Sequence, residues 1–318
     1  MTSRYRRWLA VAALSLIAAG AGLSKAPAAP ARPVSPSAQQ SFATPQAAVD
    51  TLADAVRDND IAAIGRILGP GSDRLIHSGD PVADQQGRQR FLAAYLAQSR
   101  IESDGDDRAT LLIGENDWPF PFPLVKRGER WRFDTLAGAQ AVIDRRIGRN
   151  ELAAIQVCLA YVDAQREYAA TAGSAEGLHR YAMKLVSSPG KKDGLYWPTS
   201  EGQPASPLGP LAAKAKEEGY GKSKNAEDQP YHGYRYRILV AQGPDAPGGA
   251  YDYRVKGKMI GGFGLVAYPA RWGVSGVMTF IVNHDGAVYQ KNLGPSTSAI
   301  AARMRTFDPD AGWTKAKP

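Results

Sequence analysis

The stretch RNELAAIQVCLAYVDAQREY, residues 149–168, determines how the second half of the chain folds. Leu152, Ile155, Leu159 and Val162 step by three and four residues, the spacing that places side chains on one face of an α-helix. Charged residues occupy the opposite side. An apolar stripe of this kind usually packs against a sheet, so we expect a long helix that covers one face of a β-sheet.

The same region carries two further signals. Gly148 predicts an interruption in a helical segment that spans residues 138–172, and Asn150 predicts the cap of its second piece. Cys158 is the only cysteine in the chain, which excludes a disulfide within it. Its place beside the apolar stripe indicates a small buried hydrophobic residue rather than a nucleophile.

The last third of the sequence is rich in strands. Short runs with β-branched and aromatic residues are separated by turn residues, a pattern typical of an antiparallel sheet. The runs are YRYRILV (234–240), YDYRVKGK (251–258), GGFGLVAYPA (261–270), SGVMTFIV (275–282) and AVYQK (287–291). Together with the long helix they predict an α+β domain over residues 137–305, followed by a tail at 306–318.

The segment NHDG, residues 283–286, separates the last two of these runs and predicts a hairpin turn, because Gly286 can take positive φ without steric cost. His284 and Asp285 are adjacent, and Ser275 lacks a strand-to-helix elbow, so a catalytic triad is not expected there. The four histidines are scattered, and no metal site is predicted. The adjacent carboxylates Asp106–Asp107 and Glu217–Glu218 are expected on solvated faces, and no cofactor motif is present.

The first half predicts a second α+β domain, over residues 42–136. Thr44 can cap a helix that has Pro45 at its first position, and the segment pauses at Asn59–Asp60. GRQRFLAAYLAQSRIES (87–103) predicts another helix. RATLLIGE (108–115) and FPFPLVKRGERWRFDT (120–135) predict strands, the latter as a hairpin.

The N-terminus predicts an export signal over residues 1–26, with Arg4, Arg6 and Arg7 before an apolar run and small residues after it. An uncleaved membrane anchor is the alternative. Removal of these arginines lowers the formal net charge from +8 to +5. The remaining basic residues are scattered, so nucleic-acid binding is not expected. Residues 27–41, rich in Ala and Pro, predict a linker.

Residues 187–230 are rich in Gly, Pro, Ser and Lys and predict a long, mostly irregular connection. Tyr196 and Trp197 are its most conspicuous side chains. They are expected either to pack on the sheet as a satellite cluster or to contact a partner.

Three resemblances add to this interpretation. WPFPFPLVKRGERWRFDTLAG, GLYWP, SPLGP and MIGGFGLVAYPARWGVSGVMTFIVNHDGAVYQKNLG, within about 118–294, resemble the bacterial domain-of-unknown-function family numbered 2950, which implies an exported, periplasmic envelope protein of gram-negative bacteria. TPQAAVDTLADAVRDNDIAAIGRIL and WRFDT resemble the cone-shaped NTF2-like fold, which implies a pocket. RNELAAIQVCLAYVDAQREY, with GYRYRIL and GFGLVAYP, is similar to the globular heads of type IV pilin-like proteins.

These observations favour a non-catalytic interaction or assembly module that binds another envelope protein. Two alternatives stay open. One is a periplasmic carrier or hydrolase for a small apolar or aromatic ligand; the other is a pseudo-pilin tethered by its N-terminus. The expected binding residues are Trp118, Phe120, Phe122 and Trp131 for a pocket, and Tyr196, Trp197, Arg271 and Trp272 for a partner.

Overall fold

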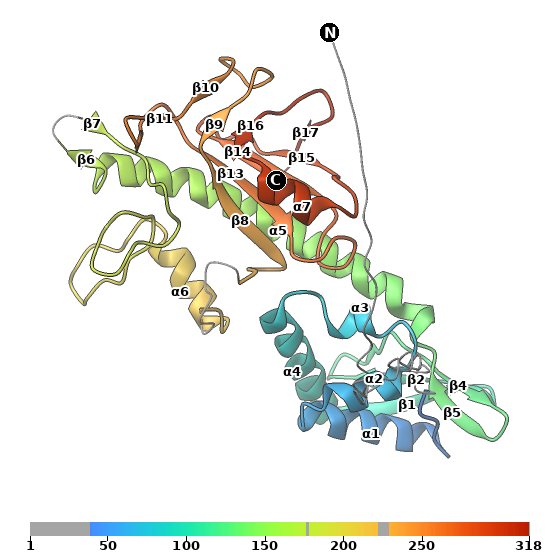
Figure 1. Cartoon of the computed structure of the whole chain (residues 1–318). Coiled ribbons are helices and arrows are strands. Elements are labelled where there is room, and N and C mark those ends of the chain that lie inside the picture. Colours follow the sequence, from blue (N-terminus) through green and yellow to red (C-terminus); the bar gives the residue numbers. More distant parts are fainter. Residues whose placement is uncertain (1–38, 176–177, 222–228, 318) are drawn as a thin grey trace, which may run out of the picture. The chain divides into compact units, whose positions relative to one another are not determined.

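The computed structural model describes residues 39–175, 178–221 and 229–317 (Figure 1). The expected signal segment and most of the expected linker lie outside these residues. The described chain combines helices with mainly antiparallel sheets, which confirms the α+β class. Its buried apolar side chains form one cluster within residues 42–133 and two within residues 154–307.

Helices and one sheet make up the front part of the chain. Thr44 caps the first helix, and its Oγ1 accepts a hydrogen bond from the amide of Ala47. The helices are α1 (Pro45–Arg57), α2 (Ile61–Leu68), α3 (Asp73–Ile76) and α4 (Pro81–Ala97). The strands are β1 (Ser99–Asp104), β2 (Arg108–Ile113), β3 (Trp118–Pro119), β4 (Leu124–Arg127) and β5 (Arg130–Phe133), in the order β1-β2-β4-β5 with β3 beside β2.

One boundary in this part differs from the expectation. The second predicted helix was expected to reach Ser103, but α4 ends at Ala97 and residues 99–104 form β1, paired antiparallel with β2. Ile101 is half-buried between exposed neighbours, and its backbone pairs with that of Leu111 in β2.

The long helix α5 (Thr135–Ala170) runs without a break, so the predicted interruption at Gly148 and cap at Asn150 are wrong. Gly148 is exposed, and a Cβ at this position would meet no atom within 4 Å. Glycine has a low helix propensity, but the helix continues through this position. The Asn150 side chain instead donates to the carbonyl of Ser275, at 2.8 Å. The apolar stripe predicted from the sequence is also partly wrong, because Leu152, its first residue, is 58% exposed and does not belong to the buried face.

The buried face of α5 includes Ile155, Cys158, Tyr161, Val162 and Gln165. Cys158 is fully buried, and burial raises the pKa of its thiol to about 12. The thiol therefore stays protonated and packs as a small apolar group, as the sequence indicated.

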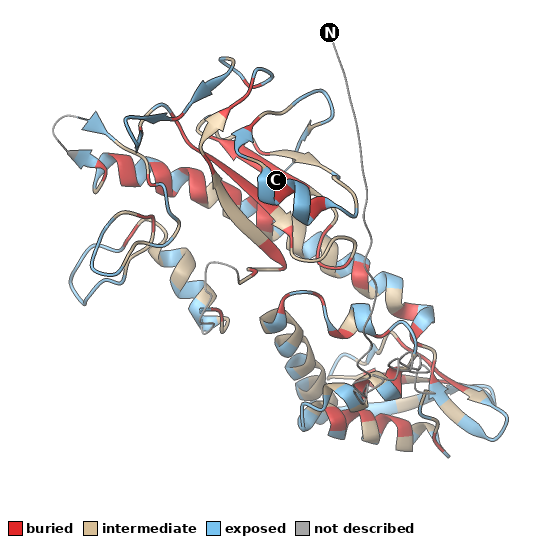
Figure 2. Cartoon of the chain, in the orientation of Figure 1, coloured by how far each residue is buried: buried red, intermediate tan, exposed pale blue. Residues whose placement is uncertain are grey.

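This face packs against a five-stranded antiparallel sheet of order β17-β15-β14-β13-β8, while the short helix α7 (Thr297–Arg303) packs on β13 (Figure 1). Figure 2 shows the buried residues concentrated on the central strands and on one side of α5. The strands are β8 (Tyr234–Leu239), β13 (Gly264–Pro269), β14 (Thr279–Asn283), β15 (Tyr289–Lys291) and β17 (Thr314–Lys315).

The predicted turn at residues 283–286 is confirmed. The amide of Gly286, at φ 84°, donates to the carbonyl of Asn283, and β14 pairs antiparallel with β15. Further short strands form small sheets of two or three strands, and the expected tail contributes one of them as well as β17 of the five-stranded sheet. These elements are β6 (Ser174–Ala175), β7 (Leu178–His179), β9 (Ala241–Gln242), β10 (Tyr251–Asp252), β11 (Arg254–Val255), β12 (Lys258–Met259) and β16 (Thr306–Phe307).

The predicted connection at residues 187–230 is largely irregular where it is described, but it contains the helix α6 (Gly209–Glu217). Pro210 at its first turn and Gly219 just after its end mark the two boundaries. Among the described residues, no helix is long and apolar enough to cross a membrane.

Two glycines of α5 give a matched test of this packing. A Cβ at Gly138 would lie 1.9 Å from the carbonyl oxygen of Pro121, whereas a Cβ at Gly148 would meet nothing within 4 Å. We expect Gly138→Ala to lower the free energy of unfolding by about 1–3 kcal/mol and Gly148→Ala to raise it by about 0.5–1 kcal/mol. Urea titration followed by circular dichroism measures both; equal effects would contradict the continuous helix and its contact with Pro121.

Candidate functional site

The structure disperses the four aromatic residues expected to line a pocket in the front part. Trp118 is 65% exposed, and Trp131 lies in β5, where its backbone pairs with that of Phe42. Phe120 and Phe122 line a cavity together and contact each other edge to face at 5.1 Å between ring centroids. Half of the predicted aromatic set therefore belongs to one site.

The residues expected to contact a partner lie in three different surroundings. Trp197 packs edge to face on Tyr168 of α5 at 6.4 Å, as a satellite of the core. Tyr196 beside it is half-buried, and its amide donates to the carbonyl of Leu185. The indole of Trp272 donates to the side chain of Asn292 at 3.0 Å.

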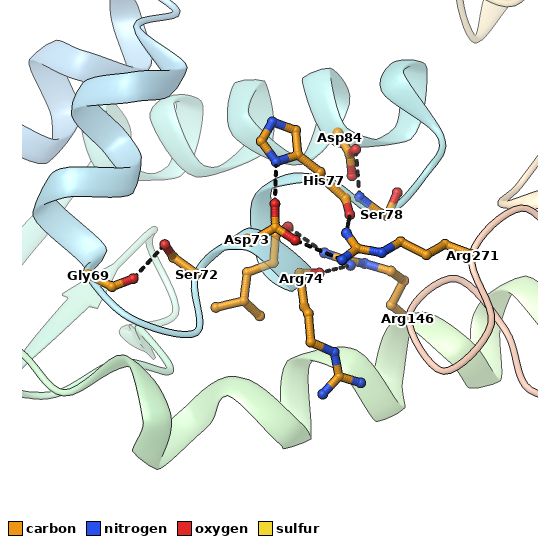
Figure 3. A network of polar contacts seen from close by, with 10 residues as sticks. Gly69, Ser72, Asp73, Arg74, His77, Ser78, Asp84, Arg146 and Arg271 are labelled. Carbon is orange, nitrogen blue, oxygen red and sulfur yellow. Dashed lines mark hydrogen bonds and ion pairs between the residues drawn. The ribbon is translucent and has the colours of Figure 1, made fainter. Parts of the chain in front are cut away.

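Arg271 occupies a polar network between α3 and the loop after β13 (Figure 3). Its guanidinium donates to the Asp73 carboxylate at 2.7 Å and to the carbonyl of His77 at 2.6 Å. The Arg271 hydrogen bond, with a smaller one from His77, holds the pKa of Asp73 below its usual range. Arg74 donates back to the carbonyl of Gly273 at 2.5 Å. The network fixes α3, which forms part of the cavity wall.

The cavity measures about 610 Å³, within the ~300–1,000 Å³ typical of small-molecule sites. Side chains of α1, α2 and α4, the segment 120–122 and α5 supply its apolar floor. These residues include Leu52, Val56, Ile64, Leu68, Phe91, Phe120, Phe122 and Val142. Several of them belong to the buried front core, so the floor is held in place by packing.

Polar side chains surround this floor. Asp84 accepts a hydrogen bond from the amide of Ser78 at 2.9 Å, yet burial raises the pKa of its carboxyl. Arg146 donates to the carbonyls of Arg74 and Leu75 at 2.8 and 2.7 Å, and burial lowers the pKa of its guanidinium (Figure 3). Both ionisable groups are therefore partly withdrawn from water at the edge of an apolar space.

The deepest polar group beside the cavity is Asp80, which has no exposed surface. One carboxylate oxygen accepts from the amide of Ala83 at 3.1 Å and so caps α4. The other accepts from the Tyr220 hydroxyl at 2.9 Å and from the amide of Gly233 at 2.8 Å. This carboxylate ties α4 to the segments that follow α6 and precede β8.

Next to this carboxylate, His232 lies at positive φ and places Nε2 3.3 Å from Glu218 Oε2. Burial lowers the pKa of the imidazole, although Glu218 opposes the shift. Glu218 is half-buried here, so the expectation that it lies on a solvated face is wrong. Gln86 of α4 donates to its carbonyl at 2.5 Å, a second link between α4 and α6.

Part of this site could have been predicted from the sequence, and the rest could not. Asp80 immediately before Pro81 is a helix-start signal that could have been recognised. Arg146, Arg149 and His232 carry no local pattern that marks them as neighbours. Their proximity depends on the position of α5 and of the connection at 187–230.

The segment that includes Ser275 and His284 does not form a triad. The Ser275 hydroxyl is buried and pairs with the backbone of Arg271, whereas the His284 ring packs against Tyr253 and Phe263. Within the described ranges, no group of three or more His, Cys, Asp or Glu side chains is arranged to hold a metal ion.

Asp80 can be tested against a cap that lacks the added links. Asp60 caps α2 through the amide of Ala63 alone and is exposed. We expect Asp80→Ala to lower the free energy of unfolding by about 2–4 kcal/mol, because it leaves buried donors without an acceptor. Asp60→Ala should cost about 1 kcal/mol. Denaturant unfolding compares them; an equal cost for both would mean that the links from Tyr220 and Gly233 add no stability.

Comparison with known proteins places the chain in one family. The searches of curated proteins and of solved structures returned no match. A family model described as "Protein of unknown function (DUF2950)" matches residues 39–316, which is nearly all of the described chain. The resemblance seen in the sequence is confirmed, and the protein belongs to the DUF2950 family.

Proposed function

We propose that this chain is an exported, periplasmic binding protein that holds a small, mainly apolar molecule in the cavity of its front part. The observation that carries the proposal is the cavity itself, about 610 Å³ with a floor of aliphatic and aromatic side chains. An apolar molecule that enters it removes both its own surface and that floor from water, which is favourable at about 25 cal/mol per Å².

We also propose that the two parts of the chain belong to two recognisable kinds of domain. Residues 42–136 form an NTF2-like domain, supported by four helices packed with an antiparallel sheet around one core. Residues 137–305 form a pilin-head-like domain, supported by a long helix packed on an antiparallel sheet. In this description the second domain also contributes α5 side chains to the cavity of the first.

Interaction with another envelope protein is a second prediction, and it receives less support. Arg271 and Trp272, two of the four residues expected at such a contact, use their polar side-chain atoms for hydrogen bonds within the chain. Tethering through residues 1–26 concerns a segment outside the described residues.

The cavity can be blocked at Gly87, which lines it from α4. A Cβ at this position would meet only the far end of Arg90, at 3.9 Å, so a larger side chain has room to enter. We expect Gly87→Trp to weaken binding of the neutral probe N-phenyl-1-naphthylamine at least about tenfold. Fluorescence titration measures the dissociation constant.

Gly148→Trp is the matched control, because Gly148 also lies within a helix but is exposed and does not line the cavity. It should bind the probe as the parent protein does. The proposal is wrong if the parent protein fails to bind apolar probes, or if Gly87→Trp binds them unchanged while it remains folded.

A further inference from the structure

Positively charged side chains outnumber negatively charged ones in the lining of the cavity. Among the residues that the structure describes, Asp84 is the one acidic residue that lines it. The basic residues are Arg88, Arg90, Arg146, Arg149 and Lys214, contributed by α4, α5 and α6. An apolar space bordered by this excess of positive charge has an electrostatic preference for anions.

Two of these cations already have partners. Arg146 uses its guanidinium on the carbonyls of Arg74 and Leu75 and lies close enough to Asp84 to feel its charge. Arg88 donates to the side-chain oxygen of Asn59 at 3.2 Å. These groups shape the wall and have little capacity left for a ligand.

The other three cations differ. Across residues 39–175, 178–221 and 229–317, the side chains of Arg90, Arg149 and Lys214 make no hydrogen bond or ion pair. Burial is the main reason why the pKa of Arg146 is lowered, and repulsion from the like charges of Arg149 and Arg271 lowers it further. A bound anion would relieve this repulsion and give the guanidinium of Arg149 a planar, bidentate partner.

The nearby carboxylates do not supply that partner. Asp80 is saturated by the donors from Ala83, Tyr220 and Gly233. Glu218 faces His232. Among the described residues, neither carboxylate forms an ion pair with Arg90, Arg149 or Lys214, although Oε2 of Glu218 accepts no hydrogen bond.

From these observations, and resting on the proposed binding function, we infer that the ligand is an amphipathic anion. Its apolar body lies on the floor formed by side chains such as Leu52, Phe91 and Phe120, and its carboxylate or phosphate group contacts Arg149 and Lys214. A fatty-acid-like or alkyl-phosphate molecule has this chemistry.

Competition against N-phenyl-1-naphthylamine tests the inference with four probes of one chain length, used below their micelle-forming concentrations. The probes are dodecanoate, dodecyl phosphate, dodecanol and dodecyltrimethylammonium. Either or both anions should bind about tenfold more tightly than the alcohol, and the cation should bind most weakly. The tighter anion identifies the head group. A higher salt concentration should weaken binding of the two anions and leave the affinity for the alcohol unchanged.

Variants of single cations test whether Arg149 and Lys214 are the residues that contact the anionic head group. Arg149→Gln and Lys214→Gln should each lower the affinity for the two anions several-fold and leave the affinity for dodecanol unchanged. Arg145→Gln and Lys216→Gln are the controls. They remove exposed cations that belong to the same two helices, α5 and α6, but do not line the cavity, so they should change the affinity for neither the anions nor dodecanol.

Two kinds of failure are distinguishable. Equal affinity for anion, alcohol and cation, or an anion preference that survives both Arg149→Gln and Lys214→Gln, would overturn the inference while the cavity still binds apolar molecules. If no probe binds, the proposed function itself is wrong.

Discussion

A single buried carboxylate constrains the arrangement on which the site depends. Asp80 is inaccessible to water and must therefore be satisfied by donors within the protein. Those donors are the amide of Ala83, the hydroxyl of Tyr220 and the amide of Gly233, the last two about 140 and 153 residues further along the chain. The start of α4 and the segments around α6 and β8 must meet at this point, and the cavity opens beside it.

The continuity of α5 is the second requirement. Its early turns contribute Val142 and Arg146 to the cavity, and its later turns place Ile155 and Tyr161 in the core of the back sheet. A break at Gly148 would have separated these two roles. The close approach of Gly138 to Pro121 fixes the same helix against the segment that carries Phe120 and Phe122. The cavity therefore depends on contacts between elements that are distant in sequence.

The sequence predicted features that depend on local chemistry. The cap at Thr44, the hairpin at 283–286, the burial of Cys158 and the α+β class all follow from short patterns. The predictions that failed required knowledge of tertiary contacts. Asn150 looks like a cap, but its side chain pairs with Ser275, and Trp118 looks like a pocket residue, but it lies on a short edge strand. Arg149 and Lys214 become neighbours of one cavity only after folding, and no periodicity in either segment marks them.

In the proposed function one cavity, built from α4, α5 and the segment around α6, binds a small molecule. Hydrogen–deuterium exchange with and without saturating dodecanoate tests this most directly, because it reports on all of these elements at once. Binding in the cavity should slow exchange together in residues 81–92, 119–122, 141–153 and 209–221, with little change in β13 and β14. Protection confined to the back sheet, or to none of these segments, would contradict it.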